Sequence, residues 1–127
     1  KGFELSFVAK NNFIGNKSKN YCTIKIGSNN NTFTLLAMMS NGSIYQQWKE
    51  IWIKDYSGYG ELASLKAGQS VQIKILFDEN SSTPNVKYWI NGIYKGSNNI
   101  NFYEANYQII FQENVGQSFS FSELSIQ

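Results

Sequence analysis

The chain has 127 residues, of which 42% are hydrophobic and 16% aromatic, and its formal net charge is +2. It contains no His and no Arg, so the Ser-His-Asp and Cys-His nucleophile systems are excluded and the commonest neutral metal ligand is missing. Nucleic-acid binding is also disfavoured, because the lysines are scattered and no guanidinium is present to grip phosphate or guanine.

The length fits a single domain, which at this size buries roughly two-thirds of the surface that the unfolded chain exposes. No repeat or linker divides the sequence, so we expect one domain over residues 1–127, a module of a larger protein. No apolar run approaches the ~20 residues that a membrane helix requires, which predicts no membrane insertion. The one cysteine, Cys22, alternates with Ile24 and Ile26, and we expect a buried structural thiol.

Apolar and polar side chains alternate along most of the chain, with the period of two that is typical of strands. Residues 71–77 give the clearest case, because Val71, Ile73, Ile75 and Phe77 share one face. The same period predicts further strands around residues 3–9, 21–26, 33–37, 86–90, 107–111 and 119–126. Eight or more short strands at this spacing predict an all-β fold, a two-sheet antiparallel β-sandwich.

Two local features concern a turn and a bulge. Asn91 and Gly92 separate two predicted strands, and a type I′ hairpin turn needs positive φ at both such positions. Within residues 119–126 the parity of the apolar side chains changes, which predicts a bulge near Ser122 and Glu123.

A strand with two tryptophans carries the first candidate binding residues. Alternation over residues 48–55 places Trp48, Glu50, Trp52 and Lys54 on one face and the isoleucines between them on the other. At a rise of ~3.3 Å per residue the two indoles stand about 13 Å apart, which suits two non-adjacent rings of a sugar chain. Aromatic faces bind the C–H-rich faces of pyranoses, while carboxylates bond their hydroxyls. Alternatively, one or both indoles face the second sheet and fill the core.

Other aromatic and polar residues extend this set. Trp89 has the opposite parity to residues 86, 88 and 90, so it could extend the aromatic platform, and Asn91 shares its face. Tyr56 and Tyr59 lie in a Gly-rich turn, where a phenol can stack and hydrogen-bond, although such tyrosines also cover hydrophobic edges. The candidate ligand-binding residues are therefore Trp48, Glu50, Trp52, Trp89, Tyr56, Tyr59, Glu61 and Asn91.

The second half of the chain has a recognisable order of strands. Residues 65–75 contain a Gly turn and a strand, residues 86–92 a strand ending in Asn-Gly, and residues 107–111 and 119–126 the closing strands. This order resembles the concanavalin A-like jelly-roll superfamily, which includes laminin-G-like domains, galectins and many carbohydrate-binding modules. The resemblance implies a jelly roll and sugar binding. Glu61 ends a Tyr-Gly-Glu run where galectins have Trp-Gly-x-Glu-x-Arg, but the galectin His and Arg are missing.

The carboxylates raise two other interpretations. Glycosidases of this superfamily use paired acids, ~5 to 5.5 Å apart in retaining enzymes, but their Glu-x-Asp-x-x-Glu pattern is absent and Glu50 and Glu61 have no recognisable spacing. Asp78, Glu79 and Asn80 could donate oxygens to a structural Ca²⁺, a cation that needs about six to eight oxygen ligands. We predict no enzyme activity and no cofactor, with Ca²⁺ at this loop as the alternative.

The leading hypothesis is a secreted or cell-surface, non-catalytic, lectin-like module that binds a glycan or polysaccharide. The alternative is a protein-binding, adhesion or assembly domain of laminin-G type, which would use an exposed strand edge or a Tyr-rich patch for a protein partner or for self-association. A glycoside hydrolase is the third hypothesis. The faces that Trp48 and Trp52 occupy discriminate best between binding and packing.

Overall fold

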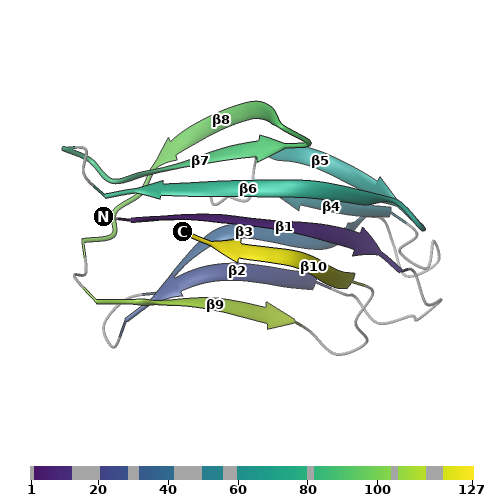
Figure 1. The fold of residues 1–127 in the computed structure, drawn as a ribbon, viewed down its shortest axis with the longest axis horizontal. Helices are drawn as coiled ribbons and strands as arrows, with labels where there is room; N and C mark the ends of the chain where they lie inside the picture. Colours follow the sequence, from purple (N-terminus) through teal and green to yellow (C-terminus); the bar gives the residue numbers. More distant parts are fainter. Residues whose placement is uncertain are drawn as a thin grey trace.

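The structure is a computed structural model, and it describes residues 2–12, 21–28, 32–41, 50–55, 60–79, 82–103, 106–113 and 119–127. These residues form ten β-strands (Figure 1). In chain order the strands are β1 (Phe3–Asn11), β2 (Tyr21–Gly27), β3 (Thr32–Asn41), β4 (Glu50–Lys54), β5 (Glu61–Lys66), β6 (Ser70–Asp78), β7 (Asn85–Ile90), β8 (Ile93–Asn99), β9 (Gln108–Glu113) and β10 (Phe119–Ile126). Within the described ranges, no helix is long and apolar enough to cross a membrane.

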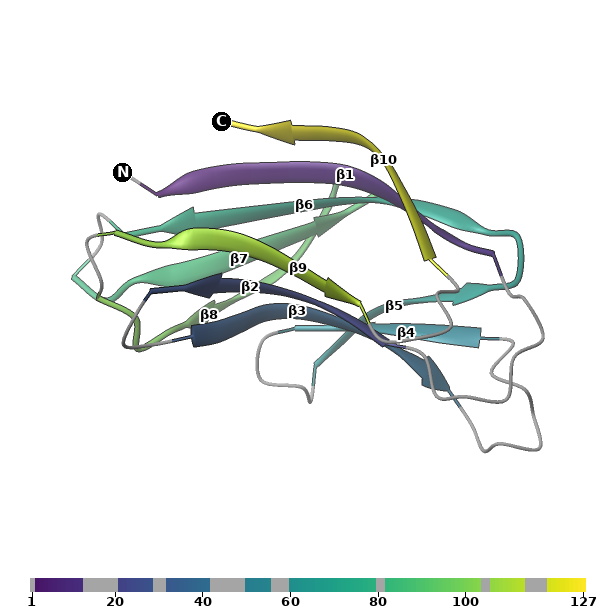
Figure 2. The same cartoon turned by 90° about the horizontal axis from the view of Figure 1, so that it is seen from below.

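The described strands form two antiparallel sheets of five strands each, stacked as two layers (Figure 2). The first, called the β6 sheet, has the order β10-β1-β6-β7-β8. The second, called the β3 sheet, has the order β5-β4-β3-β2-β9. The predicted all-β, two-sheet antiparallel β-sandwich is therefore confirmed.

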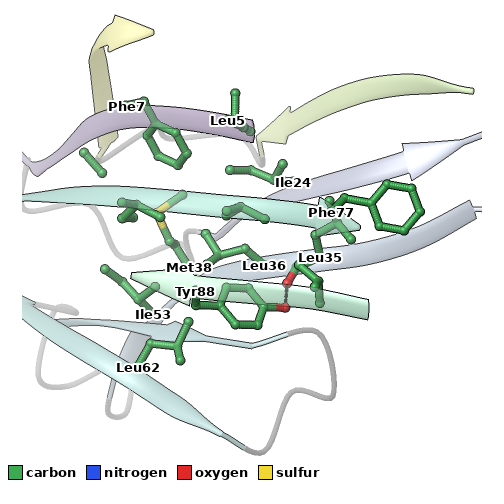
Figure 3. Close-up of a cluster of buried hydrophobic side chains, with 14 of the residues drawn as sticks. Leu5, Phe7, Ile24, Leu35, Leu36, Met38, Ile53, Leu62, Phe77 and Tyr88 are labelled. Atoms are coloured by element: carbon green, nitrogen blue, oxygen red, sulfur yellow. Dashed lines mark hydrogen bonds between the residues drawn. The ribbon is translucent and has the colours of Figure 1, made fainter. Parts of the chain in front are cut away.

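One hydrophobic cluster fills the space between the sheets (Figure 3). The β6 sheet contributes the alternate residues of three strands, namely Phe3, Leu5, Phe7, Ala9, Val71, Ile73, Ile75, Phe77, Val86, Tyr88 and Ile90. The β3 sheet contributes Cys22, Ile24, Ile26, Leu35, Leu36, Met38, Ile53, Leu62 and Leu65. Burying one large side chain of this kind stabilises the fold by roughly 1.5–3 kcal/mol. The predicted inward faces of residues 71–77 and of Cys22 are confirmed.

Strand β3 departs from simple alternation. Leu35 and Leu36 are adjacent in sequence, yet both are fully buried. The cause is a register shift in the β2–β3 ladder, where Ile24 pairs with Leu36 and the next pair is Lys25 with Thr34. Leu35 is the extra residue at this shift, so both side chains can enter the core.

The predicted hairpin and bulge are both confirmed. Asn91 and Gly92 connect β7 to β8 with φ of 51° and 81°, the left-handed geometry of a type I′ turn. Glu123 in β10 has φ of 56°, and the β1–β10 register shifts between Ser6 and Val8 directly opposite it. The bulge lets β10 follow β1 while its apolar side chains change parity.

Aromatic rings close the edge of the sandwich where β9 and β10 lie. Phe7, Phe111 and Phe121 come from β1, β9 and β10 and pack edge to face, with ring centroids 5.6 to 5.8 Å apart. Edge-to-face geometry places the positive edge of one ring on the negative face of the next. The trio therefore joins the last strand of each sheet across the interior.

Residues near the two ends of the chain also meet. The backbone N–H of Glu4 donates to the carbonyl of Gln127, and the N–H of Gln127 donates to the carbonyl of Glu4, each at 2.9 Å. These reciprocal bonds extend the ladder between β1 and β10, so both termini lie side by side at one end of the β6 sheet (Figure 1).

Candidate functional site

Trp89 lies on the outer face of the β6 sheet. Its neighbours in β7, Tyr88 and Ile90, are buried, and alternation turns the Trp89 indole to the opposite side, where it is partly exposed. The prediction that Trp89 faces away from residues 86, 88 and 90 is confirmed.

The cross-strand partners of Trp89 bring polar and aromatic groups to the indole. Lys74 on β6 and Tyr94 on β8 are its register partners, and Ser6 on β1 is the partner of Lys74. Four neighbouring strands thus present one residue each, in a row that spans about 14 Å at the usual strand spacing. The Lys74 Nζ lies 4.3 Å from the centre of the Trp89 ring. The Trp89 and Tyr94 ring centroids are 5.4 Å apart, with their planes at 59°.

A depression with a volume of about 220 Å³ opens beside this row. Its lining residues are Glu4, Ser6, Gln72, Lys74, Trp89 and Gly92. The lining offers one indole face together with carboxylate, ammonium, amide and hydroxyl groups. This set can stack on a flat ligand and bond its polar groups from several directions. We call the six lining residues together with Tyr94 the Trp89 site.

Asn91, a predicted ligand-binding residue, borders the Trp89 site but has a structural bond. Its side-chain oxygen accepts a hydrogen bond from the backbone N–H of Gln72 at 2.9 Å. Its own backbone N–H donates to the carbonyl of Gln72 at 2.8 Å. Asn91 therefore fastens the β7–β8 turn to β6, and through this turn it fixes the position of Gly92 in the lining.

Trp52 lies on the outer face of the other sheet. Its neighbour Ile53 is fully buried, whereas Trp52 is partly exposed. The Lys54 Nζ lies 4.6 Å from the centre of the Trp52 ring. The register partners of Trp52 and Lys54 on β5 are Ser64 and Glu61, both exposed. We call these four residues the Trp52 site. For Trp52 the core-filling alternative is wrong, because the core position belongs to Ile53.

The expectation that Trp89 extends the platform of Trp52 is wrong. Both indoles face outward, but Trp52 belongs to the β3 sheet and Trp89 to the β6 sheet. The hydrophobic core separates them. Parity along a strand predicts which side of its own sheet a residue occupies, but not which sheet contains the strand. Of the other predicted site residues, Glu61 lies in the Trp52 site and Asn91 borders the Trp89 site.

Four other predicted residues have no described side chain. Trp48, Tyr56 and Tyr59 lie outside the described residues, and for Glu50 the structure describes only its place in β4, opposite Lys66. The predicted pair of tryptophans on one strand is therefore represented by Trp52 alone.

Asp55 was missed by sequence reasoning. One carboxylate oxygen accepts the backbone N–H of Gly60 at 3.2 Å, and the other accepts Nδ2 of Asn98 on β8 at 3.1 Å. The backbone N–H of Asp55 also donates to the carbonyl of Gly60 at 2.9 Å. Asp55 thus closes the base of the β4–β5 connection, which contains Tyr56 and Tyr59, and ties it to the β6 sheet. A side chain at position 60 would meet this carboxylate, because a Cβ there lies 2.2 Å from Oδ2.

A larger depression, of about 330 Å³, lies beside Tyr107 and is lined mainly by small and polar residues: Gly27, Ser28, Thr32, Asn106, Tyr107, Gln108 and Ile110. Burial, and secondly the negative charge of Glu79, raise the pKa of the Tyr107 phenol above its ordinary 10.0. The Tyr107 ring packs on Phe3, Phe77 and Phe102. Its face is therefore already used inside the protein, and we place the candidate site at Trp89 instead.

Carboxylates in the described part of the chain are sparse. Among the lining residues of the Trp89 site, Glu4 supplies the one carboxylate, whereas glycoside hydrolysis uses a pair. In the described ranges, no group of three or more His, Cys, Asp and Glu residues is placed to hold a metal ion. Asn80 of the proposed Ca²⁺ loop lies outside those ranges. The chemistry that the Trp89 site offers is stacking and hydrogen bonding.

No protein-family model matches the chain, and a search of curated proteins found none similar in sequence.

Proposed function

We propose that this protein is a non-catalytic, lectin-like carbohydrate-binding module that works outside the cell or at its surface, and that the Trp89 site holds a sugar ring. The observation that carries the proposal is the row of Ser6, Lys74, Trp89 and Tyr94 beside a depression with polar lining. Indole faces bind the C–H-rich faces of pyranoses, and the row is long enough for more than one sugar ring. A jelly roll of the concanavalin A-like superfamily is part of this proposal.

The contacts at Trp89 suggest how a sugar would be held. In the free protein the Lys74 ammonium lies over the indole, a cation–π contact that contributes roughly 0.5–1 kcal/mol at exposed sites. A pyranose that stacks on the indole replaces this contact, and the released ammonium can then donate to a sugar hydroxyl. The Glu4 carboxylate can accept further hydrogen bonds, and the Gln72 amide can both donate and accept them, because both residues line the depression.

The number of carboxyl groups at the Trp89 site supports binding without catalysis. A retaining or inverting glycosidase needs one carboxyl group on each side of the scissile bond. Glu4 is the one carboxylate among the described lining residues, and the other lining residues supply no second acid. A bound saccharide is therefore expected to dissociate from the site without being hydrolysed.

The test is a glycan array followed by titration of the best-binding glycan, using intrinsic tryptophan fluorescence. Trp89→Ala is expected to weaken binding at the Trp89 site by about tenfold or more, equivalent to a loss of roughly 1.4 kcal/mol. Tyr103→Ala is the matched control, because Tyr103 is 65% exposed and lies outside the Trp89 site. The proposal fails if no glycan binds, or if Trp89→Ala leaves both the affinity and the number of bound glycans unchanged.

One observation favours a second candidate, an assembly or protein-binding domain. β10 ends the strand order of the β6 sheet, and its Leu124 and Ile126 are 56% and 53% exposed. An edge strand with exposed apolar side chains can pair with a strand of another chain. Sedimentation equilibrium tests this: self-association that is abolished by Leu124→Lys, with no response to any glycan, would favour assembly over sugar binding.

A further inference from the structure

Two tryptophans on opposite sides of the sandwich each have a lysine ammonium over the indole ring. The Lys74 Nζ lies 4.3 Å from the centre of the Trp89 ring, and the Lys54 Nζ lies 4.6 Å from the centre of the Trp52 ring. Each indole is partly exposed. Trp89 lies between the buried residues Tyr88 and Ile90, and Trp52 precedes the buried Ile53. The same side-chain pair therefore occurs once on each sheet.

The likeness extends to the next polar residues. At the Trp89 site, Glu4 and Ser6 of β1 line the depression with Lys74 of β6. At the Trp52 site, Glu61 is the cross-strand partner of Lys54, and Ser64 is the partner of Trp52. Both sites thus include an indole, an ammonium group, a carboxylate and a serine hydroxyl. The charges at each site cancel, a balance that fits a neutral ligand rich in hydroxyl groups better than an anion or a cation.

The two sites face in opposite directions. Residues beside Trp89 and Trp52 point into the shared core, and the two sheets lie face to face (Figure 2). Packed sheets stand about 10 Å apart, and the outward indoles lie beyond each sheet. A single sugar ring therefore cannot contact both indoles, and each site must take its own segment of glycan.

We infer that the domain has two equivalent sugar-binding faces and bridges two segments of a neutral polysaccharide, one on Trp89 and one on Trp52. The inference rests on the proposed function, because it assigns the same chemistry to a second face. It goes beyond that function by making one domain divalent. A divalent domain can cross-link polysaccharide chains without forming an oligomer.

The experiment uses four soluble neutral polysaccharides as probes: a β-glucan, a mannan, a galactan and a xylan. Calorimetry with oligosaccharides of the probe that binds measures the number of bound segments, and light scattering with the polymer measures cross-linking. The unchanged protein is expected to bind two segments and to cross-link the polymer. Trp52→Ala and Trp89→Ala are each expected to bind one segment without cross-linking, and the double variant is expected to lose at least about tenfold in affinity.

Ser64→Gln guards against a Trp52→Ala variant that fails to fold. Ser64 is exposed and lies across from Trp52, so a longer side chain there obstructs the Trp52 site without entering the core. It is expected to abolish cross-linking and to leave binding at Trp89 unchanged. A polyuronate serves as the charged probe, and its affinity is expected to be lower than that of the neutral polymer.

The outcomes separate the two proposals. Binding of one segment, lost in Trp89→Ala and unaffected by both Trp52→Ala and Ser64→Gln, would overturn the divalent inference and leave the proposed function standing. Tighter binding of the polyuronate than of every neutral probe would overturn the neutral ligand class. Binding of neither the neutral polysaccharides nor the polyuronate would overturn the inference together with the proposed function.

Discussion

Tyr88 on β7 donates a hydrogen bond from its phenolic oxygen to the backbone carbonyl of Leu35 on β3, across the interior of the sandwich (Figure 3). Leu35 is the extra residue at the register shift of β3, and it has no register partner in β2 or β4. The carbonyl of Leu35 therefore accepts its hydrogen bond from a side chain of the opposite sheet. Tyr88 fills core volume with its ring and completes the hydrogen bonding of a bulge with its hydroxyl.

Tyr88→Phe is expected to lower the free energy of unfolding by about 1–3 kcal/mol, because the Leu35 carbonyl stays buried and loses this donor. Urea denaturation followed by fluorescence measures the change. Tyr94→Phe is the matched control, since Tyr94 is 52% exposed and its hydroxyl is accessible to water. Equal midpoints for the two variants would contradict the role given to the Tyr88 hydroxyl.

Asn98→Asp is expected to destabilise the fold at neutral pH, because it places a second carboxylate about 3 Å from Oδ2 of Asp55, where Nδ2 of Asn98 donates at 3.1 Å. The loss should shrink as the pH falls, since protonation of either acid removes the repulsion and restores a donor. Thermal unfolding at several pH values measures this. Adding Asp55→Asn to Asn98→Asp should recover stability at neutral pH, and failure to recover would show that charge is not the cause.

Tyr107 is expected to lose its proton at a higher pH than exposed tyrosines, because burial and then the Glu79 charge raise its pKa above 10.0. The folded state holds this proton more tightly than the unfolded state, so the stabilisation is fully present below pH 10 and is lost as the pH rises through the folded-state pKa.

The difference in phenolate absorbance between the unchanged protein and Tyr107→Phe isolates this group during an alkaline titration. Tyr107→Phe keeps the ring contacts with Phe77 and Phe102, so the packing is retained and only the ionisable hydroxyl is lost. In Glu79→Gln the Tyr107 pKa should fall but stay raised, because burial is the larger cause. A Tyr107 that ionises together with the exposed tyrosines would refute the prediction.

Cys22 is expected to react with an aromatic disulfide reagent only as fast as the protein opens, because its side chain is fully buried in β2. Its modification rate should therefore rise with urea in parallel with unfolding. Ser64→Cys provides an exposed thiol on the same fold and should react at once, before Cys22 does. Immediate modification of Cys22 in the native protein would contradict its burial.

The sequence predicts the strands and their faces well where one strand side is apolar. Val71, Ile73, Ile75 and Phe77 alternate with polar residues except at Leu76, and a type I′ turn at Asn91-Gly92 requires positive φ, so both features follow from local geometry. The same reasoning correctly turns Trp52 and Trp89 outward. Leu35 and Leu36 lie beyond it, because a register shift depends on how β3 pairs with β2.

The Trp89 site could be predicted only in part for the same reason. The sequence pattern predicts that Trp89 faces outward. Lys74 and Ser6 are placed beside it by pairing with strands distant in sequence, and Tyr94 by a β7–β8 pairing whose register shifts next to Trp89. Parity assigns no pairing register and no sheet. The sequence therefore indicates an aromatic surface residue, whereas the strand order and register determine that Trp52 lies on the other side of the sandwich.

The reciprocal bonds between Glu4 and Gln127 decide how the domain would respond to mechanical tension. Ladder bonds in an antiparallel pair run perpendicular to the strands. Since the outer ends of β1 and β10 lie together, a pull on the two termini loads one pair of bonds at a time, starting with Glu4 and Gln127. The β1–β10 hydrogen bonds would then break one after another, beginning at the end of the ladder where the termini lie. This sequential rupture needs less force than shearing two strands past each other, which breaks all of their hydrogen bonds at once.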